Sequence, residues 1–513
     1  MLARCLNFRR LTGIIFILEN NKITTMTKNL IYILSSLSLL IGCNETVKSP
    51  LIVKSAPAIY PDYVDVTVPS TIAPLNFTVK TEKFDLIDIE VTGKIKGSMH
   101  VQDKEIIQFS EKEWHSLLSQ NKGADLNIVV SLKSNGVWKQ FKSFPIYVSN
   151  YSIDYGLVYR LIAPGYEVYS KMGIYQRDLS TFDQKPIIEN TLIPGTCVNC
   201  HAFNKNNPNS MSLHLRGAQG ATMLLVDGKM ELLNTKTDST LSACVYPYWH
   251  PSGNFIAYSV NKTKQAFHEV RNERVEVFDE ASDVVVYNVR TNQLTSTKFL
   301  RTEALETFPV FSPDGKTLYF CSSKKQDIQT GYKNIKYSLC KIDFNPATGA
   351  FGNKVDTLVS AALTGKSVSF PRPSFDGKFL MFTLSNYGNF SIWHREADLY
   401  LLTLKTGTFR SIKEVNSAET ESFHDWSSNS RWFVFSSRRD DGLYTRPYFA
   451  SIDEKGNVTK PFMLPQQDPR FYDSSLTSYN VPEFVTSKVK VNVREFENKA
   501  LIKERKQVMF TMK

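Results

Sequence analysis

Four copies of one short tract constrain the fold of this chain more than any other feature. Each copy begins with an aromatic residue, passes through a tight turn such as Asp314-Gly315 and ends in a second apolar strand, which is the pattern of a β-hairpin. Successive copies start 62, 62 and 53 residues apart. This period is that of one four-stranded blade, so the sequence predicts an all-β protein with a β-propeller. The copies occupy residues 246–259, 308–321, 370–383 and 423–436.

Two further tracts fall in the same register. Residues 197–214 begin 49 residues before the first copy, and residues 478–485 begin 55 residues after the start of the last one. Counting both gives about six blades, and a contribution from residues 151–190 would raise the number to seven or eight. We expect the propeller to span residues 196–490, with the motif described below in its first blade. The flanking segments are expected to be an aromatic-rich connector at 151–195 and a C-terminal tail at 491–513.

The segment before the connector has strand patterns of its own. Apolar residues alternate with a period of two around Val64 and Ile87, and Asn135-Gly136 has the composition of a hairpin turn. Only residues 112–119 look helical. We therefore expect a small β-sandwich over residues 59–150, preceded by a polar tether at 43–58.

Cys197, Cys200 and His201 form a C-x-x-C-H motif inside the expected propeller. Two thiols at this spacing can each add to one vinyl group of a haem, and the adjacent imidazole then reaches the iron. The motif predicts covalent attachment of haem c at Cys197 and Cys200, with His201 as an axial ligand. Other interpretations stay open: a disulfide between the two cysteines, a zinc site completed by a fourth ligand, or a thioredoxin-like redox pair.

An iron held by His201 needs a sixth ligand unless it binds a substrate. Met211 and His214 are near in sequence, but they have opposite parity on an extended strand, so at most one of them can reach the haem. We favour His214, with Met211 as the alternative, because Met211 also fits an alternating apolar face.

Cys321 and Cys340 end two strands of one expected blade, which makes them candidates for a cross-strand disulfide in an oxidising compartment. The chain contains no nucleophile elbow, zinc-protease helix, phosphate-binding loop or dinucleotide fingerprint. No catalytic residue is predicted, and an electron carrier or a binding protein is expected rather than a hydrolase.

Residues 1–42 predict export. Lys28 precedes an apolar run at 30–41, which is shorter than the roughly 20 residues of a transmembrane helix and fits a signal peptide. The run ends in Gly42 and Cys43, which resembles the bacterial lipobox and implies acylation of Cys43. Met26 is a candidate for the true start, because it directly precedes this signal.

The net charge of the chain is modest. It is +11 for the whole sequence, and removal of residues 1–42, with their five basic and one acidic residues, leaves +7. Without a long run of Lys or Arg, this charge predicts no nucleic-acid partner. The lipid anchor, rather than the charge, predicts association with a membrane.

The repeat over residues 308–321 has an aromatic residue, Pro, two further residues, then Ser-Pro-Asp-Gly-Lys and a strand. It resembles the WD40-like repeat of TolB-like propellers. Tracts at 158–162, 172–177, 197–201 and 478–484 resemble those of TolB-like lipoproteins of Bacteroidetes that carry a C-x-x-C-H motif. This resemblance covers roughly residues 60 to 490. It implies a propeller in the cell envelope, anchored by lipid at the outer membrane and facing the periplasm or the surface.

Taken together, these features predict an exported lipoprotein with one covalent haem c that passes electrons to an unknown redox or envelope protein. The alternative is a propeller without redox activity that binds a protein or glycan, with Cys197 and Cys200 as a disulfide.

Overall fold

A computed structural model describes residues 45–80, 83–164, 171–270 and 273–513. The chain divides into two units, Met1–Ser49 and Pro50–Lys513, and the fold described below belongs to the second. The expected export signal and the expected lipidation site Cys43 lie outside the described residues. In the described ranges, no helix is both long and apolar enough to span a membrane.

The N-terminal part of the second unit contains one large sheet. Its strand order is β1-β8-β7-β5-β6, with β9 beside β7 and β3 beside β9, while β2 and β4 pair separately. The expected helix at 112–119 is confirmed as α2 (Glu111–Gln120), which buries Trp114. The turn at Asn135-Gly136 joins β7 to β8, and both residues have positive φ. The β-sandwich itself stays a prediction. The strands are β1 (Leu51–Val53), β2 (Ile59–Tyr60), β3 (Thr67–Pro69), β4 (Thr78–Val79), β5 (Leu86–Gly93), β6 (Ser98–Asp103), β7 (Asp125–Ser134), β8 (Val137–Phe141) and β9 (Phe144–Ser149).

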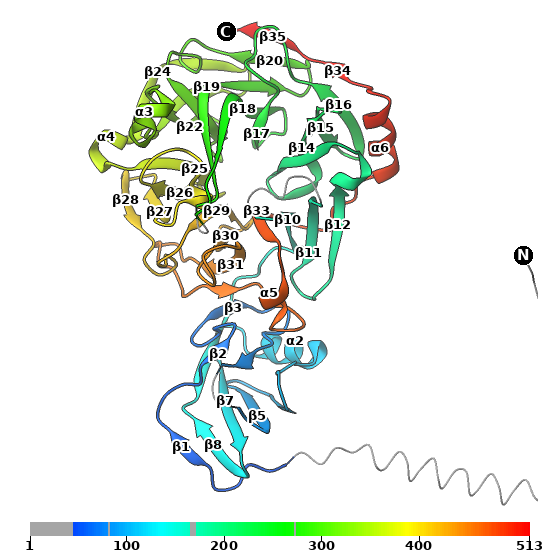
Figure 1. The fold of residues 1–513 in the computed structure, drawn as a ribbon, viewed down its shortest axis with the longest axis vertical. Helices are drawn as coiled ribbons and strands as arrows, with labels where there is room; N and C mark the ends of the chain where they lie inside the picture. Colours follow the sequence, from blue (N-terminus) through cyan, green and yellow to red (C-terminus); the bar gives the residue numbers. More distant parts are fainter. Residues whose placement is uncertain (1–44, 81–82, 165–170, 271–272) are drawn as a thin grey trace, which may run out of the picture. The chain divides into compact units, whose positions relative to one another are not determined.

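The rest of the chain forms the β-propeller that the repeats predict. Its sheets follow one another around a centre, and within the sheets β13–β16, β17–β20, β21–β24, β25–β28 and β29–β32 each strand pairs with the next along the chain (Figure 1). One bridge between Ser282 and Leu305 joins the second and third of these sheets. The first three sheets contain β13 (Thr196–Asn204), β14 (Asn207–Gly217), β15 (Ala221–Val226), β16 (Lys229–Asn234), β17 (Val245–Trp249), β18 (Phe255–Phe267), β19 (Val275–Asn288), β20 (Gln293–Ser296), β21 (Leu305–Phe311), β22 (Thr317–Ser323), β23 (Ser338–Asn345) and β24 (Ala350–Val359).

The other two of these sheets follow directly along the chain. Short helical segments lie in the loops and at one end of the propeller. These sheets and segments contain β25 (Ser367–Pro373), β26 (Phe379–Ser385), β27 (Asp398–Thr403), β28 (Thr408–Ser411), β29 (Glu421–Trp426), β30 (Trp432–Ser437), β31 (Arg446–Ser451), β32 (Phe462–Met463), α3 (Ile328–Gly331), η2 (Tyr332–Asn334), α4 (Ala361–Thr364), η3 (Ser391–Trp393) and α5 (Phe471–Ser474).

A further sheet combines strands from the two ends of the propeller. β33 (Ser478–Val485) pairs with β10 (Gly156–Ile162), which is followed by β11 (Gly173–Asp178) and β12 (Gln184–Glu189). The strand expected at 478–485 is therefore present. Residues 151–195, expected to be a connector, instead supply three strands of this closing sheet and the short η1 (Asn190–Leu192). Two tyrosines of this segment are strand residues, since Tyr159 of β10 lies directly opposite Tyr175 of β11.

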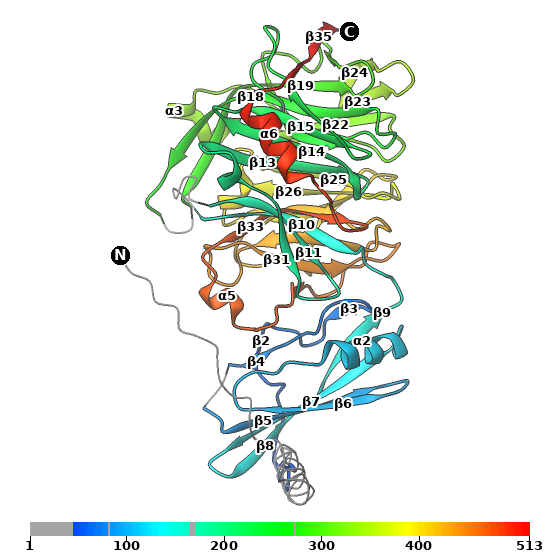
Figure 2. The ribbon, with the colours of Figure 1, turned by 90° about the vertical axis from the view of Figure 1, so that its right-hand side faces the viewer.

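Residues 491–513, expected to be a tail, pack on the outside of the propeller. Helix α6 (Val493–Leu501) buries Phe496 in the same apolar cluster as Met230 of β16 (Figure 2). β34 (Lys506–Gln507) then pairs with β16, and β35 (Met509–Met512) pairs with β20. The C-terminal segment thus extends two sheets at their outer edges.

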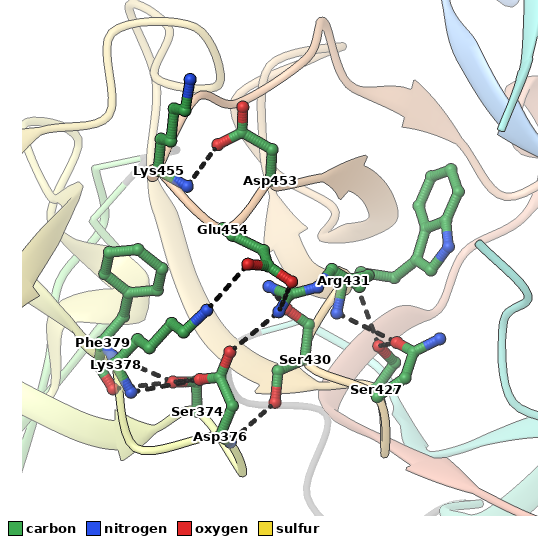
Figure 3. Close-up of polar contacts among 12 residues, drawn as sticks. Ser374, Asp376, Lys378, Phe379, Ser427, Ser430, Arg431, Asp453, Glu454 and Lys455 are labelled. Atoms are coloured by element: carbon green, nitrogen blue, oxygen red, sulfur yellow. Dashed lines mark hydrogen bonds and ion pairs between the residues drawn. The ribbon is translucent and has the colours of Figure 1, made fainter. Parts of the chain in front are cut away.

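The tight turn of the repeats is held by one set of hydrogen bonds. In the third copy, Ser374 Oγ donates to Asp376 Oδ1 at 2.7 Å, and the backbone N–H of Lys378 donates to the same oxygen at 3.1 Å. The backbone N–H of Phe379 donates to Ser374 Oγ at 3.0 Å. Figure 3 shows this arrangement. The Ser and Asp of the repeat are therefore required by the turn, because their side chains satisfy its free backbone donors.

The same turn also contacts the next sheet. Arg431 Nη2 lies 3.1 Å from Asp376 Oδ2, and the backbone N–H of Asp376 donates to Ser430 Oγ at 3.1 Å (Figure 3). Lys378 makes an ion pair with Glu454 at 3.2 Å. Asp376 thus holds its own turn and joins it to the turn of the β29–β32 sheet.

Candidate functional site

Each innermost strand of the propeller carries one non-glycine residue in the left-handed region. Their φ angles lie between 45° and 51°, and the strand register shifts at each position, which marks a β-bulge. We call these residues the bulge ring. In the described part of the chain, its members are Cys200, Tyr246, Phe308, Phe370, Phe423 and Val481.

The aromatic members of the bulge ring contact one another in sequence. The ring centroids of Tyr246 and Phe308 are 4.7 Å apart, those of Phe308 and Phe370 are 4.4 Å apart, and those of Phe370 and Phe423 are 4.8 Å apart. Cys200 therefore occupies a position that four other sheets fill with an aromatic side chain. The second cysteine of the C-x-x-C-H motif thus faces the centre of the propeller.

A cavity of about 250 Å³ lies at the bulge ring, and all six ring residues line it. Cys197 and His201 line it as well. On a regular strand, residues three apart point to opposite faces, but the bulge between Asn199 and Ala202 inserts an extra residue into the register. This local distortion explains how Cys197 and Cys200 both reach what we call the central cavity.

The two thiols of the motif are free and buried. Cys197 Sγ lies 3.3 Å from the Sδ atom of Met172, which also lines the central cavity. Burial raises the pKa of the Cys197 thiol, and the nearby Arg160 only partly offsets this effect. Cys197 is therefore a protonated thiol at neutral pH rather than a reactive thiolate.

The imidazole of His201 is buried. Among the described residues, neither of its nitrogens makes a hydrogen bond of good geometry. The backbone carbonyls of Val158 and Val481 favour its protonated form, but burial and the positive charge of Arg160 dominate and lower its pKa to about 3. Its Nε2 atom lies 3.9 Å from Glu483 Oε2, beyond hydrogen-bond range. His201 is thus a neutral imidazole with free lone-pair capacity, the form that ligates metals.

The residues favoured as the sixth ligand do not reach this cavity. His214 and Met211 lie on β14, the second strand of the β13–β16 sheet, and neither lines the central cavity. Met211 packs with Leu213 and Leu215 in an apolar cluster, as its parity predicted. His214 is buried opposite Asn199 and Thr222. The prediction of His214 is corrected: of the residues of β14, only Arg216, which has a longer side chain, lines the central cavity.

Two other residues with a suitable donor atom, Met172 and His424, line the central cavity. Met172 comes from the segment expected to be a connector, and His424 follows the ring residue Phe423 as His201 follows Cys200. Four of the six ring residues are followed by Pro, so the two histidines share an exceptional position. Among the described residues, neither nitrogen of His424 makes a hydrogen bond of good geometry. Burial lowers its pKa to about 3, although the backbone carbonyl of Met381 favours the protonated form. The alignment of the repeats contains this signal, because it places His424 where His201 stands in its own tract.

The expected disulfide between Cys321 and Cys340 does not form, and both residues are free. Cys321 lies opposite Leu339, whereas Cys340 lies opposite Phe320, so the two are displaced by one residue along adjacent strands. Their side chains consequently belong to different apolar clusters on the two faces of the sheet. A disulfide needs both Cβ atoms on one face.

A charged group lies two residues beyond the bulge ring. Arg372, Asp425 and Glu483 all follow ring residues at this spacing, and all line the central cavity. Burial raises the pKa of Asp425 to about 7, and burial together with Asp425 raises that of Glu483. Within the described ranges, no three His, Cys, Asp or Glu side chains are grouped closely enough to hold a metal ion.

One long hairpin contributes to the cavity from outside the ring. β18 and β19 extend beyond the other strands of their sheet toward the centre of the propeller (Figure 1), and Phe267 and Val275 near the hairpin end line the central cavity. Glu276 bonds to His394 at 2.7 Å, and Asp279 accepts a hydrogen bond from Asn389 at 2.7 Å. The hairpin is therefore fixed over one side of the cavity by buried polar contacts.

No protein-family model matches the chain, and no curated protein is significantly similar to it. Among solved structures, an oligogalacturonate lyase in complex with manganese is 12% identical, with a TM-score of 0.34, over 58% of this chain and 71% of that one. A puromycin-hydrolyzing peptidase of Mycobacterium tuberculosis is 10% identical, with a TM-score of 0.33, over 82% of this chain and 57% of that one. A DUF4784 family protein from Bacteroides caccae is 8% identical, with a TM-score of 0.28, over 72% and 97%. This chain thus spans less than two thirds of the peptidase, and its propeller fold rests on the strand pairing described above.

Proposed function

We propose that this protein is an electron-transfer protein whose central cavity holds one c-type haem, attached to Cys197 and Cys200 with His201 as an axial ligand. One observation carries this proposal: the bulge at Cys200 turns two free thiols and one imidazole into the same cavity. The same three residues on a regular strand would face different sides of the sheet.

The chemistry of the cavity residues fits this group. His201 is neutral, and among the described residues neither ring nitrogen makes a hydrogen bond of good geometry, so a ring nitrogen is available to bind iron. A bound haem iron supplies one-electron redox chemistry. The cavity of about 250 Å³ is slightly smaller than the roughly 300–1,000 Å³ of ligand pockets, so its walls must move apart to admit a macrocycle.

His424 replaces His214 as our candidate for the sixth ligand. It lines the central cavity, and its place after Phe423 repeats that of His201 after Cys200. Among the described residues, neither of its ring nitrogens makes a hydrogen bond of good geometry. Two neutral imidazoles on iron give a coordinatively saturated centre, which favours electron transfer over binding of a substrate.

The remaining parts of the proposal concern architecture and location. The bulge ring supports a propeller of six blades, one for each ring residue. The lipobox-like Cys43 and the resemblance to TolB-like lipoproteins support a lipid anchor at the outer membrane, with the predicted β-sandwich between anchor and propeller. The electron partner is then a protein of the cell envelope.

The test is covalent haem attachment. The full chain is exported in a bacterial host that matures c-type cytochromes, and the purified protein is examined by its reduced pyridine-haemochrome spectrum and intact mass. We expect one added haem mass in the wild type and none in the double variant Cys197→Ala/Cys200→Ala. Cys244→Ala is the matched control, because Cys244 is buried but does not line the central cavity.

A wild-type mass without haem contradicts the proposal. If that mass is also two protons lighter than expected for free thiols in the motif, Cys197 and Cys200 form a disulfide. The alternative of a propeller that binds a protein or glycan without redox activity then becomes the working function.

A further inference from the structure

One arginine at the central cavity is buried without an acceptor. Arg438 directly follows β30, is 2% exposed and lines the cavity. Its Cζ atom lies 3.2 Å from the ring centroid of Trp393, which also lines the cavity. Its Nε and Nη1 atoms have no hydrogen-bond partner among the described residues. The guanidinium is therefore held in place by the indole ring while two of its nitrogens have unused donors.

Arg446, another buried arginine of this chain, has acceptors for its hydrogen bonds. Arg446, which is 1% exposed, donates to the backbone oxygens of Thr477, Tyr472 and Ser475 at 2.6 to 3.1 Å. Such donors to carbonyl oxygens make a buried guanidinium tolerable, whereas a buried charge without them is costly. The contrast indicates that Arg438 has a functional role, and that the protein loses some stability by burying its charge.

Arg438 forms no ion pair in the described part of the chain. Burial lowers its pKa well below the usual value, and the charges of Asp441 and Glu419 only partly offset this effect. Glu419 pairs with Arg395 instead, and Asp441 accepts backbone N–H groups of its own loop.

Three further arginines, Arg160, Arg216 and Arg372, line the same cavity. Arg160 is 9% exposed, and its Nε atom has no partner, while its Nη1 atom donates to Asn199. Arg216 lies opposite Cys197 on the adjacent strand. Asp425 and Glu483 are the acidic residues that line the cavity, so its lining carries four arginines against two carboxyl groups. The charge of the cavity lining is thus positive overall.

We propose that Arg438 binds a carboxylate group inside the central cavity, with Trp393 as the platform that orients its guanidinium. A carboxylate offers the charge-assisted hydrogen bonds that the free nitrogens lack. Two sources have this chemistry, a free organic acid and the propionate of the haem proposed above. The proposal does not depend on the haem, because a free organic acid can bind Arg438 in a cavity that holds no haem.

The experiment measures binding of succinate to the full-length double variant Cys197→Ala/Cys200→Ala by calorimetry at constant ionic strength. Succinamide, which has the same shape without the charge, is the ligand control. Arg438→Met is then added to this background, with Arg410→Met as the control for loss of a surface arginine. We expect succinate but not succinamide to bind, and the dissociation constant to rise roughly 10- to 100-fold with Arg438→Met, as expected for loss of a hydrogen bond to a charged group.

Thermal unfolding of the ligand-free proteins shows whether Arg438→Met causes a folding defect. We expect the melting temperature with Arg438→Met to be at least that of its parent, because the variant removes an unpaired buried charge. The same titration of haem-loaded wild type separates the two sources. If succinate binds the haem-loaded wild type, the ligand of Arg438 is a free acid. If succinate binds the double variant but not the haem-loaded protein, a haem propionate occupies Arg438.

The proposal is overturned if succinate does not bind the double variant, or if Arg438→Met leaves its affinity unchanged. A fall in melting temperature with Arg438→Met also counts against it, since Arg438 would then be a structural residue. The result is distinguishable from failure of the haem proposal, because haem attachment is measured by mass in the wild type alone.

Discussion

Nε2 of His394 lies 2.7 Å from Oε2 of Glu276, and the two side chains are 4% and 5% exposed. This buried pair connects the β18–β19 hairpin, which lines the central cavity, with the loop before β27. Glu396 approaches the other ring nitrogen of His394 at 3.6 Å, and Tyr387 packs on the ring. The hairpin is therefore anchored by a group that titrates.

The first prediction concerns pH. Burial opposes the charge of His394, but its hydrogen bonds to Glu276 and Glu396 raise its pKa to about 9, above the value of 6.5 for an unperturbed imidazole. The folded protein holds this proton more tightly than the unfolded chain, so the stabilisation is complete below pH 6.5 and is lost as the pH rises through 9. Between these values the free energy of unfolding should fall by roughly 3 kcal/mol, measured by urea denaturation.

The variant His394→Gln serves as the control for this pH dependence. It keeps a polar side chain but cannot be protonated, so the decline that His394 causes should be absent from its unfolding curves. An equal decline in the variant and the wild type between pH 6.5 and 9 would show that other groups are responsible.

The second prediction concerns the repeat turn. Asp376→Ala removes an acceptor for Ser374 Oγ and for the backbone N–H of Lys378 and a partner of Arg431, and the contacts with Ser374 and Arg431 are partly buried. We expect a loss of about 1–3 kcal/mol in the free energy of unfolding. Lys378→Ala removes only the ion pair with Glu454, whose members are 41% and 64% exposed, and should cost less than about 1 kcal/mol. Equal losses in the two variants would contradict the role given to Asp376.

The repeats allowed the propeller to be predicted because their turn is chemically specific. Ser312 and Asp314 make the same contacts in the second copy as Ser374 and Asp376 in the third, so the pattern of residues reflects a pattern of hydrogen bonds. The strands β10 to β12 carry no such turn and were missed. They form a sheet only together with β33, which pairs with β10 from the far end of the sequence.

The candidate site was predicted in part because its motif has a specific spacing. The motif identified Cys197, Cys200 and His201 by spacing alone, and all three line one cavity. His214 was misplaced because parity on a strand says which face a residue occupies but not how far it lies from the centre. Arg438 and Trp393 come from loops of different sheets, so no local pattern in the sequence could bring them together.

The third prediction concerns the thiols outside the motif. Cys321 and Cys340 face opposite sides of their sheet, so both should react with iodoacetamide when the protein is denatured without a reductant. Peptide masses should show each of them fully alkylated. A peptide pair joined through these cysteines would contradict the register of β22 and β23. Alkylation after reduction provides the reference for complete modification.

The fourth prediction separates His424 from His214 in the haem-loaded protein. His424 lines the central cavity, whereas His214 lies on the second strand of its sheet and does not line it. His424→Ala should open a coordination position, so the oxidised spectrum should change from low spin to high spin and cyanide should bind, while His214→Ala should leave the spectrum unchanged. Circular dichroism establishes that both variants are folded. A spectral change in His214→Ala alone would restore His214 as the ligand, and unchanged spectra in both variants would point to Met172, the other cavity residue with a suitable donor atom.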